Sequence, residues 1–241
     1  MQDEHSLTAL IADLEHPEKP VIRTAADALI RAAAGSAAVR GALTRLLADP
    51  QRKNRWAIAY VLAQLPSPPG EAIAALLDAL DHQEADIRWA IALLLVHAAK
   101  ENRQTVEALL RLCREGTPTQ RRQAVYCIRD LNLQDTTSRQ ALMEALRDED
   151  PRVRIAAAGS LRRTAGLDRS DHDALLNTFF ADPDARVRSV AALTLAQTGY
   201  AAELFFQALE KEGHGGDQSI GRAARAALDL LKNKRAAPYG S

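Results

Sequence analysis

The segment DEDPRVRIAAAGSL at residues 148–161 decides the fold, because the chain repeats its pattern at a nearly fixed interval. DPDARVRSVAALTL at 182–195, HQEADIRWAIALLL at 82–95 and, more weakly, DPQRKNRWAIAYVL at 49–62 share the pattern. Aligning these segments and weaker copies on their common arginine gives seven anchors, Arg23, Arg55, Arg88, Arg121, Arg154, Arg188 and Gly221. Successive anchors lie 32 to 34 residues apart. A period of this length is typical of stacked supersecondary units.

Each repeat contains two helical patterns. With the anchor as position 0, the second pattern carries apolar or small residues at −1, +3 and +7, as in Val153, Ala157 and Leu161. That spacing places them on one helix face. The first pattern carries paired leucines or phenylalanines, such as Leu175–Leu176, and breakers such as PSPPG at 66–70 separate the helices. Because no single pair can bury its apolar face alone, we predict an all-α solenoid of about seven two-helix repeats and about fourteen helices.

The composition limits the class of protein. Hydrophobic residues make up 47% and charged residues 26%, as in soluble folded proteins, and two cysteines cannot form a disulfide framework. The 31 basic and 31 acidic side chains cancel, so no overall field attracts nucleic acid or an anionic membrane. No apolar stretch approaches the roughly 20 residues that span a bilayer, and the acidic start MQDEHSLTAL lacks the features of a signal peptide. We expect a cytoplasmic protein without membrane binding.

The repeat also defines the domain organisation. The anchors extend over nearly the whole chain, so we predict one solenoid domain at residues 1–235. The ending KNKRAAPYGS is basic and then small and irregular, which favours a disordered tail at residues 236–241.

The repeat resembles the HEAT-repeat family, particularly its bacterial short-repeat branch, the PBS-lyase-like HEAT repeats. The family unit has an aspartate six residues before the arginine, then Val-Arg-x-x-Ala-Ala-x-x-Leu. The acidic residue and its spacing are kept in Asp49–Arg55, Glu115–Arg121, Asp148–Arg154 and Asp182–Arg188. His82 and Pro17 depart at the acidic position, and the seventh repeat has glycines, Gly215 and Gly221, at both places. The resemblance covers about residues 7–231 and implies a right-handed superhelix whose seventh unit is a terminal cap.

The recurrent acid and arginine favour a structural role for both. A guanidinium binds a carboxylate through two hydrogen bonds, so each pair can join to itself and to neighbouring repeats. We predict a structural ladder of Asp49, Arg55, Arg88, Glu115, Arg121, Asp148, Arg154, Asp182 and Arg188. A nucleic-acid-binding protein would show a clearly basic face, and the central excess of basic residues here is modest. Nucleic-acid binding is therefore kept only as an alternative function.

Positions +1, +5 and +9 of the second helices point away from the packing stripe. Large apolar and aromatic residues gather there in the second to fourth repeats, and such residues are enriched with arginine at binding hot spots. The predicted partner-binding residues are Trp56, Tyr60, Trp89, Leu93, His97, Arg122, Tyr126 and Arg129. In HEAT solenoids the second helices line the concave surface, so these residues would form an apolar-aromatic ribbon. They could equally fill the inner curve of the stack or form a homodimer interface.

The sequence offers little support for catalysis. The histidines show no metal-ligand spacing, and no phosphate-binding loop or G-x-S-x-G motif is present. We predict no catalytic, cofactor or metal site, and a scaffold or adaptor that binds another protein. The family resemblance leaves open a phycobilin-lyase-like or chaperone-like subunit. A HEAT-like DNA glycosylase would need an aspartate near its tryptophans, where Tyr60 and Leu93 stand here.

Overall fold

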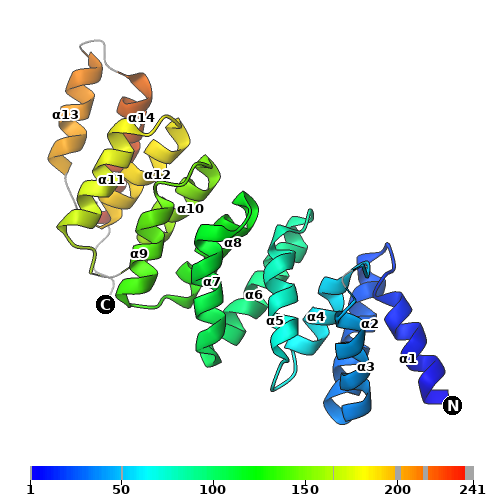
Figure 1. Cartoon of the computed structure of the whole chain (residues 1–241). Coiled ribbons are helices and arrows are strands. Elements are labelled where there is room, and N and C mark those ends of the chain that lie inside the picture. The colour runs from blue at the N-terminus through cyan, green and yellow to red at the C-terminus, as the bar shows by residue number, and fades with distance from the viewer. Residues whose placement is uncertain (1, 50, 165, 199–201, 214–216, 237–241) are drawn as a thin grey trace. The chain divides into compact units, whose positions relative to one another are not determined.

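A computed structural model describes all residues except 1, 50, 165, 199–201, 214–216 and 237–241. The described residues form fourteen α-helices and one short 3-10 helix, η1 (Ala79–Asp81), with no strand among them (Figure 1). Helices with odd and even numbers are the first and second helices of the seven repeats. The predicted all-α architecture is therefore confirmed, with fourteen helices in seven pairs.

The helix bounds follow the repeat. The first helices are α1 (Gln2–Asp13), α3 (Ala37–Leu47), α5 (Gly70–Asp78), α7 (Arg103–Glu115), α9 (Thr136–Ala145), α11 (Arg169–Ala181) and α13 (Ala202–Gly213). The second helices are α2 (Lys19–Gly35), α4 (Arg55–Ala63), α6 (Ala85–Glu101), α8 (Pro118–Leu131), α10 (Pro151–Leu161), α12 (Ala185–Gln197) and α14 (Gln218–Ala236). Every anchor residue lies in the first turns of its second helix.

The chain divides into two compact units, residues 1–109 and 110–241. In the first unit α2 packs on α4 and α4 on α6, while α3 packs on α5. In the second unit α8, α10, α12 and α14 pack in succession, and each of α9, α11 and α13 packs on the second helix of its own repeat. Each unit therefore contains a continuous layer of second helices. That residues 1–235 form one right-handed solenoid remains a prediction. Ala236 ends α14, and the rest of the predicted tail lies outside the described residues.

The stripe at −1, +3 and +7 forms the core beneath the second helices. Val153, Ala157 and Leu161 of α10 are fully buried, as are the corresponding residues of α12. The paired residues of the first helices divide their roles, because neighbours on a helix point about 100° apart. Phe179 is fully buried, for example, whereas Phe180 is 39% exposed.

The second repeat differs in how its second helix begins. In α10 the anchor Arg154 is the fourth helical residue, but α4 starts at its anchor Arg55, after Asn54 in the left-handed region at φ 46°. The side-chain amide of Asn54 donates to the carbonyl of Leu14 at 2.9 Å, which holds this turn against the first repeat. The missing first turn of α4 leaves α2 and α6 within reach of each other. Lys19 at the start of α2 binds Asp86 of α6 at 2.6 Å and also pairs with Glu84.

Candidate functional site

The recurrent arginines join consecutive repeats in the second unit. Arg154 donates from Nε and Nη2 to the two carboxylate oxygens of Asp182 at 2.7 and 2.9 Å, and from Nη1 to the carbonyl of Asp148 at 2.9 Å. Arg121 binds Asp148 in the same two-point manner at 2.7 and 2.8 Å. Arg188 continues the series with Asp217 at 3.4 Å. Each arginine therefore meets the carboxylate of the following repeat, and only the backbone carbonyls of its own turn.

These ion pairs are largely shielded from water. The side chains of Arg154 and Asp182 are 11% and 6% exposed, and the hydrogen bonds that Arg154 donates to Asp182 raise the pKa of Arg154. Asp182 also accepts the amide of Asp184 at 2.8 Å, so one carboxylate closes its own turn and binds the preceding repeat. A guanidinium held in this way is not available to a phosphate.

In the first unit the equivalent arginines and the residues six positions before them have other hydrogen-bond partners. Arg55 donates to the carbonyl of Leu47 at 2.9 Å and lies 3.8 Å from Asp78, while Asp49 accepts the amide of Gln51. Arg88 donates to the carbonyl of His82, whose Nδ1 accepts the amide of Glu84 at 3.1 Å. A histidine thus closes this turn as aspartate does elsewhere.

The fourth-repeat glutamate also departs from the spacing rule. Glu115 is exposed, and Arg121 donates instead to the carbonyl of Gly116 at 3.0 Å. The predicted side-chain pairing between an acid and the arginine six residues after it is therefore wrong.

The predicted contact between neighbouring repeats is present, because Arg121 binds Asp148 and Arg154 binds Asp182. In Asp148 and Asp182 the carboxylate binds the arginine of the repeat before it and also accepts an amide of its own turn. Gly215, which stands at the acidic position of the seventh repeat, lies outside the described residues.

The two tryptophans occupy matching places on α4 and α6 but have different surroundings. Trp56 is half-buried, with its ring edge-on to His82 at a centroid distance of 5.8 Å. Its indole Nε1 is enclosed and has no hydrogen-bond partner among the described residues. Tyr60, one turn further along α4, is also half-buried. Trp89 is 66% exposed.

Trp89 belongs to an exposed stripe on α6. Leu93 follows one turn later and is 47% exposed, and His97 follows after another turn and is exposed as well. We call Trp89, Leu93 and His97 the α6 stripe. Phe180 and Phe206 are the other large exposed apolar side chains of the described residues, and they lie on the first helices α11 and α13. Within the described second helices, the large exposed apolar residues are therefore both in this stripe.

The remaining predicted binding residues belong to the second unit and form a polar cluster. Arg129 lies over the ring of Tyr126 at 4.8 Å and binds both carboxylate oxygens of Asp130 at 2.8 and 3.0 Å. That hydrogen bonding raises the pKa of Arg129. Arg163 of the next repeat lies 3.4 Å from the same carboxylate. Arg122 is half-buried, and its enclosed Nε has no hydrogen-bond partner among the described residues.

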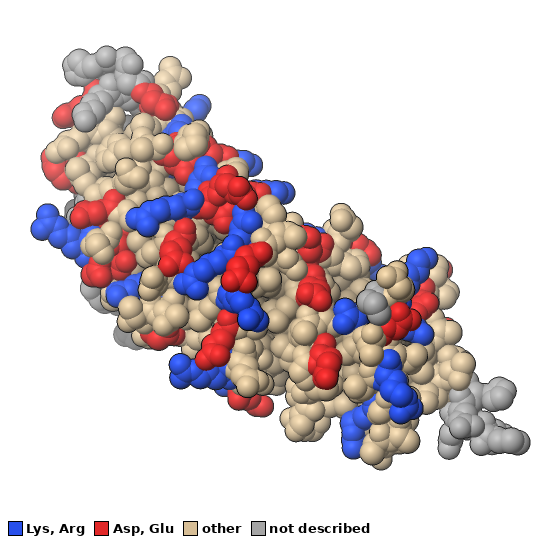
Figure 2. Space-filling view, viewed as in Figure 1, with Lys and Arg blue, Asp and Glu red and all other residues tan. Residues whose placement is uncertain are grey.

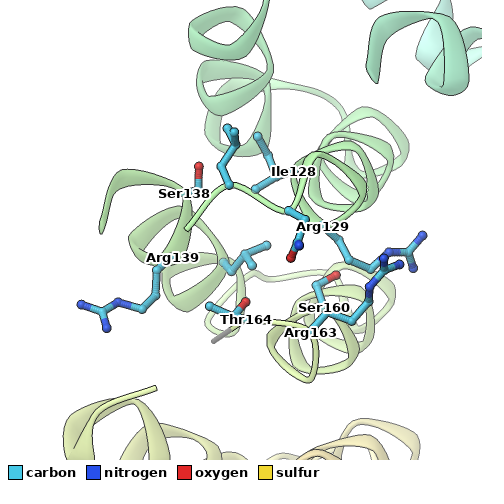
Figure 3. Close-up of a pocket in the computed structure, with 10 residues that line it drawn as sticks. Ile128, Arg129, Ser138, Arg139, Ser160, Arg163 and Thr164 are labelled. Atoms are coloured by element: carbon cyan, nitrogen blue, oxygen red, sulfur yellow. The ribbon is translucent and has the colours of Figure 1, made fainter. Parts of the chain in front are cut away.

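A small cavity lies next to this cluster (Figure 3). Its volume of about 10 Å³ has room for about one water molecule. Arg129, Arg139 and Arg163 contribute to its walls, but Figure 3 shows their guanidinium groups directed away from its centre. The cavity is therefore too small for an organic ligand.

A larger groove lies in the first unit, beside the end of the α6 stripe. It has a volume of about 610 Å³ and is built by the ends of α4 and α6, the proline-rich loop after α4 and the starts of α5 and α7. His97 lines this groove and also ends the α6 stripe. No sequence motif predicts a site here, although PSPPG indicates the loop that forms one wall.

The described residues hold no group of three or more His, Cys, Asp or Glu placed to bind a metal ion. Burial raises the pKa of both Cys113 and Cys127 to about 12, so each remains a thiol at neutral pH. None of the described helices has the length and apolar character to cross a membrane. Figure 2 shows basic and acidic side chains interspersed over the displayed face of each unit.

Paired helices repeated along a chain, with inter-repeat ion pairs, define a helical-repeat protein. The sequence model of the HEAT repeats matches residues 7–96 and 106–196, and the chain belongs to that family. None of the curated proteins compared with it matches the chain.

One solved structure supports the same kind of fold, and two others are reported as more distantly similar. YibA from E. coli is similar at 15% identity with a TM-score of 0.55, over 93% of this chain and 92% of that one. Computationally designed armadillo repeat proteins for modular peptide recognition reach a TM-score of 0.41 at 18% identity, covering 79% and 99%. The CpcE–CpcF complex of phycocyanin lyase from Nostoc reaches 0.39 at 19%, covering 94% of each chain.

Proposed function

We propose that this protein is a non-enzymatic interaction module that binds a segment of another protein on the second-helix layer of its first unit. The exposure of Trp89 together with Leu93 is the observation that carries the proposal. Neighbouring exposed apolar residues are characteristic of binding sites, and tryptophan supplies much of the energy where it is buried by a partner. The cytoplasmic location predicted from the composition is part of the same proposal.

The exposure of the two tryptophans separates their proposed roles. Trp89 is assigned to partner binding, because little of it contacts its own chain. Trp56 is assigned mainly to packing between repeats, because its ring lies against His82. The ion-paired arginines of the second unit argue against nucleic acid as the partner.

Affinity capture from the native lysate, followed by calorimetry with the recovered protein, tests the proposal. Replacing Trp89 with alanine should weaken binding by about 2 kcal/mol, or roughly 30-fold, while changing stability by less than about 0.5 kcal/mol. Phe206→Ala is the control, because it removes another large exposed apolar side chain, 49% exposed, from α13. The proposal fails if the Trp89 variant, folded by circular dichroism, binds the recovered protein as tightly as the control.

A further inference from the structure

The α6 stripe and the groove form one continuous feature of the first unit. Trp89, Leu93 and His97 recur every four residues, and Glu101 extends the series into the groove. Glu101 lies twelve positions after Trp89, which corresponds to about 18 Å along a helix. An extended chain covers that distance in about five to six residues at roughly 3.3 Å each. A short extended peptide is therefore the right length to contact both ends.

The groove has a mixed polar and apolar lining with one charged side chain. Apolar side chains and prolines make up much of its wall, namely Ala63, Leu65, Pro66, Pro68, Ile73 and Ala98. Glu101 is the one acidic or basic residue that lines it, apart from the histidine. Lys100 and Arg103 are close to it in sequence, but neither lines the groove, and Arg103 binds Glu107 at 3.2 Å. A basic side chain that enters the groove would therefore meet one carboxylate and no lysine or arginine on its wall.

Two groups of the groove lack partners within the described residues. The carboxylate of Glu101 makes no ion pair or hydrogen bond with them. Thr105 is only 2% exposed, and its hydroxyl also makes no hydrogen bond there, although the residue lines the groove. The hydroxyl of Thr105 is not among the enclosed polar atoms of the described residues, so it can bond to a group that enters the groove.

We propose that the groove and the α6 stripe bind an extended peptide with a large apolar side chain and, about five residues away, a lysine or arginine. The apolar side chain packs against Trp89 and Leu93, and the basic side chain pairs with Glu101. A polar group of the peptide backbone bonds to the hydroxyl of Thr105. This inference rests on the proposed function and adds the chemistry of the partner.

Selection of a phage-displayed library of random eight-residue peptides on the full-length chain tests the proposal. Peptides selected on the wild type should combine an aromatic or aliphatic residue with Lys or Arg four to six positions away. Their binding should weaken about 10-fold or more with Glu101→Lys, and salt should weaken binding to the wild type. Thr105→Val should cost about 3- to 10-fold. Asp27→Lys is the control, because it reverses an exposed charge of the same unit outside the groove.

The outcomes separate this inference from the proposed function. Peptides that require Trp89 but bind equally to the wild type and Glu101→Lys would overturn the inference and leave the proposed function standing. Peptides that bind without need of Trp89 would contradict both. Failure to select any peptide, with light scattering showing self-association that Leu93→Ala abolishes, would overturn the inference in favour of a second copy as the occupant.

Discussion

At the scale of single residues, the arginine–aspartate pairs set the alignment of consecutive repeats. A guanidinium and a carboxylate in two-point contact have a defined relative orientation, which two apolar surfaces do not impose. Arg154 and Asp182 also satisfy the backbone groups of two turns. Removing one partner would leave the other charged, desolvated and unpaired.

Asp182→Ala should therefore destabilise the fold by about 3 kcal/mol, because Arg154 loses its counter-ion. Urea unfolding followed by circular dichroism measures the loss. Asp49→Ala is the matched control, since Asp49 closes the equivalent turn with Gln51 but shares no ion pair among the described residues. It should cost no more than about 1 kcal/mol. Equal losses in the two variants would show that turn closure, and not the ion pair, is the main contribution.

The acidic residues at two helix starts predict how stability depends on pH. Hydrogen bonds from Arg152 and Arg186 lower the pKa of Asp150 and Asp184 to about 2 in the folded protein. An unfolded aspartate titrates near 3.9. Because the folded pKa is depressed, the stabilisation is present above about pH 4 and is lost as the pH falls towards 2.

The urea midpoint should therefore fall between pH 5 and pH 2.5 more steeply in the wild type than in an Asp150→Asn/Asp184→Asn variant. Asparagine can still accept the amide hydrogen bond at each helix start, so the caps are kept while the titration is removed. Identical pH profiles for the two proteins would contradict the role assigned to these carboxylates.

The tryptophans show what a sequence pattern leaves undetermined at this scale. Trp56 and Trp89 hold the same position in adjacent repeats, so periodicity alone assigns them the same environment. The difference involves a residue of another segment, His82, whose ring contacts that of Trp56 in a T-shaped arrangement. The groove beside α6 also has no signature in the sequence. It depends on how the loop after α4 packs near the start of α7, and no local motif encodes that placement.

At the scale of helices and turns, two glycines differ in whether there is room for a side chain. A Cβ on Gly116, between α7 and α8, would lie 2.9 Å from the Cβ of Gln120 and 3.0 Å from the carbonyl of Leu112. A Cβ on Gly35, at the end of α2, would meet nothing within 4 Å. The turn before α8 is also fixed by a capping box between Thr117 and Gln120, which limits its ability to relax.

Gly116→Ala should consequently destabilise the protein by about 1–3 kcal/mol through overpacking. Gly35→Ala should stabilise it by about 0.5 kcal/mol, because alanine favours the helix and restricts the unfolded chain. Thermal unfolding of the two variants beside the wild type measures both effects. A stabilising Gly116→Ala would contradict the close packing of this turn.

At the scale of the whole molecule, the sequence alone predicts the repeat, the helix count and the buried stripe. These succeed because each is a local pattern copied along the chain, as Val153, Ala157 and Leu161 illustrate. The division at residues 109 and 110 was not predicted. The anchors continue through it at a regular spacing, so the periodicity gives no sign of it.

The position of the tryptophans allows the two units to be observed separately. Both lie in the first unit, so tryptophan fluorescence reports on that unit, whereas circular dichroism reports on all helices. Leu161 is fully buried in the second unit. Its replacement with alanine should lower the free energy of unfolding by about 2–5 kcal/mol. We expect the circular dichroism transition of this variant to shift more than its fluorescence transition. Equal shifts would show that the chain unfolds as one cooperative whole.

The central claim is that a partner segment covers Trp89. The most direct test titrates selected peptides into a Trp56→Phe variant, in which Trp89 is the sole tryptophan. We predict a saturable blue shift of the emission and reduced quenching by acrylamide, because a side chain that is 66% exposed becomes buried. Peptides that bind this variant by calorimetry but leave the emission and quenching of Trp89 unchanged would contradict the claim.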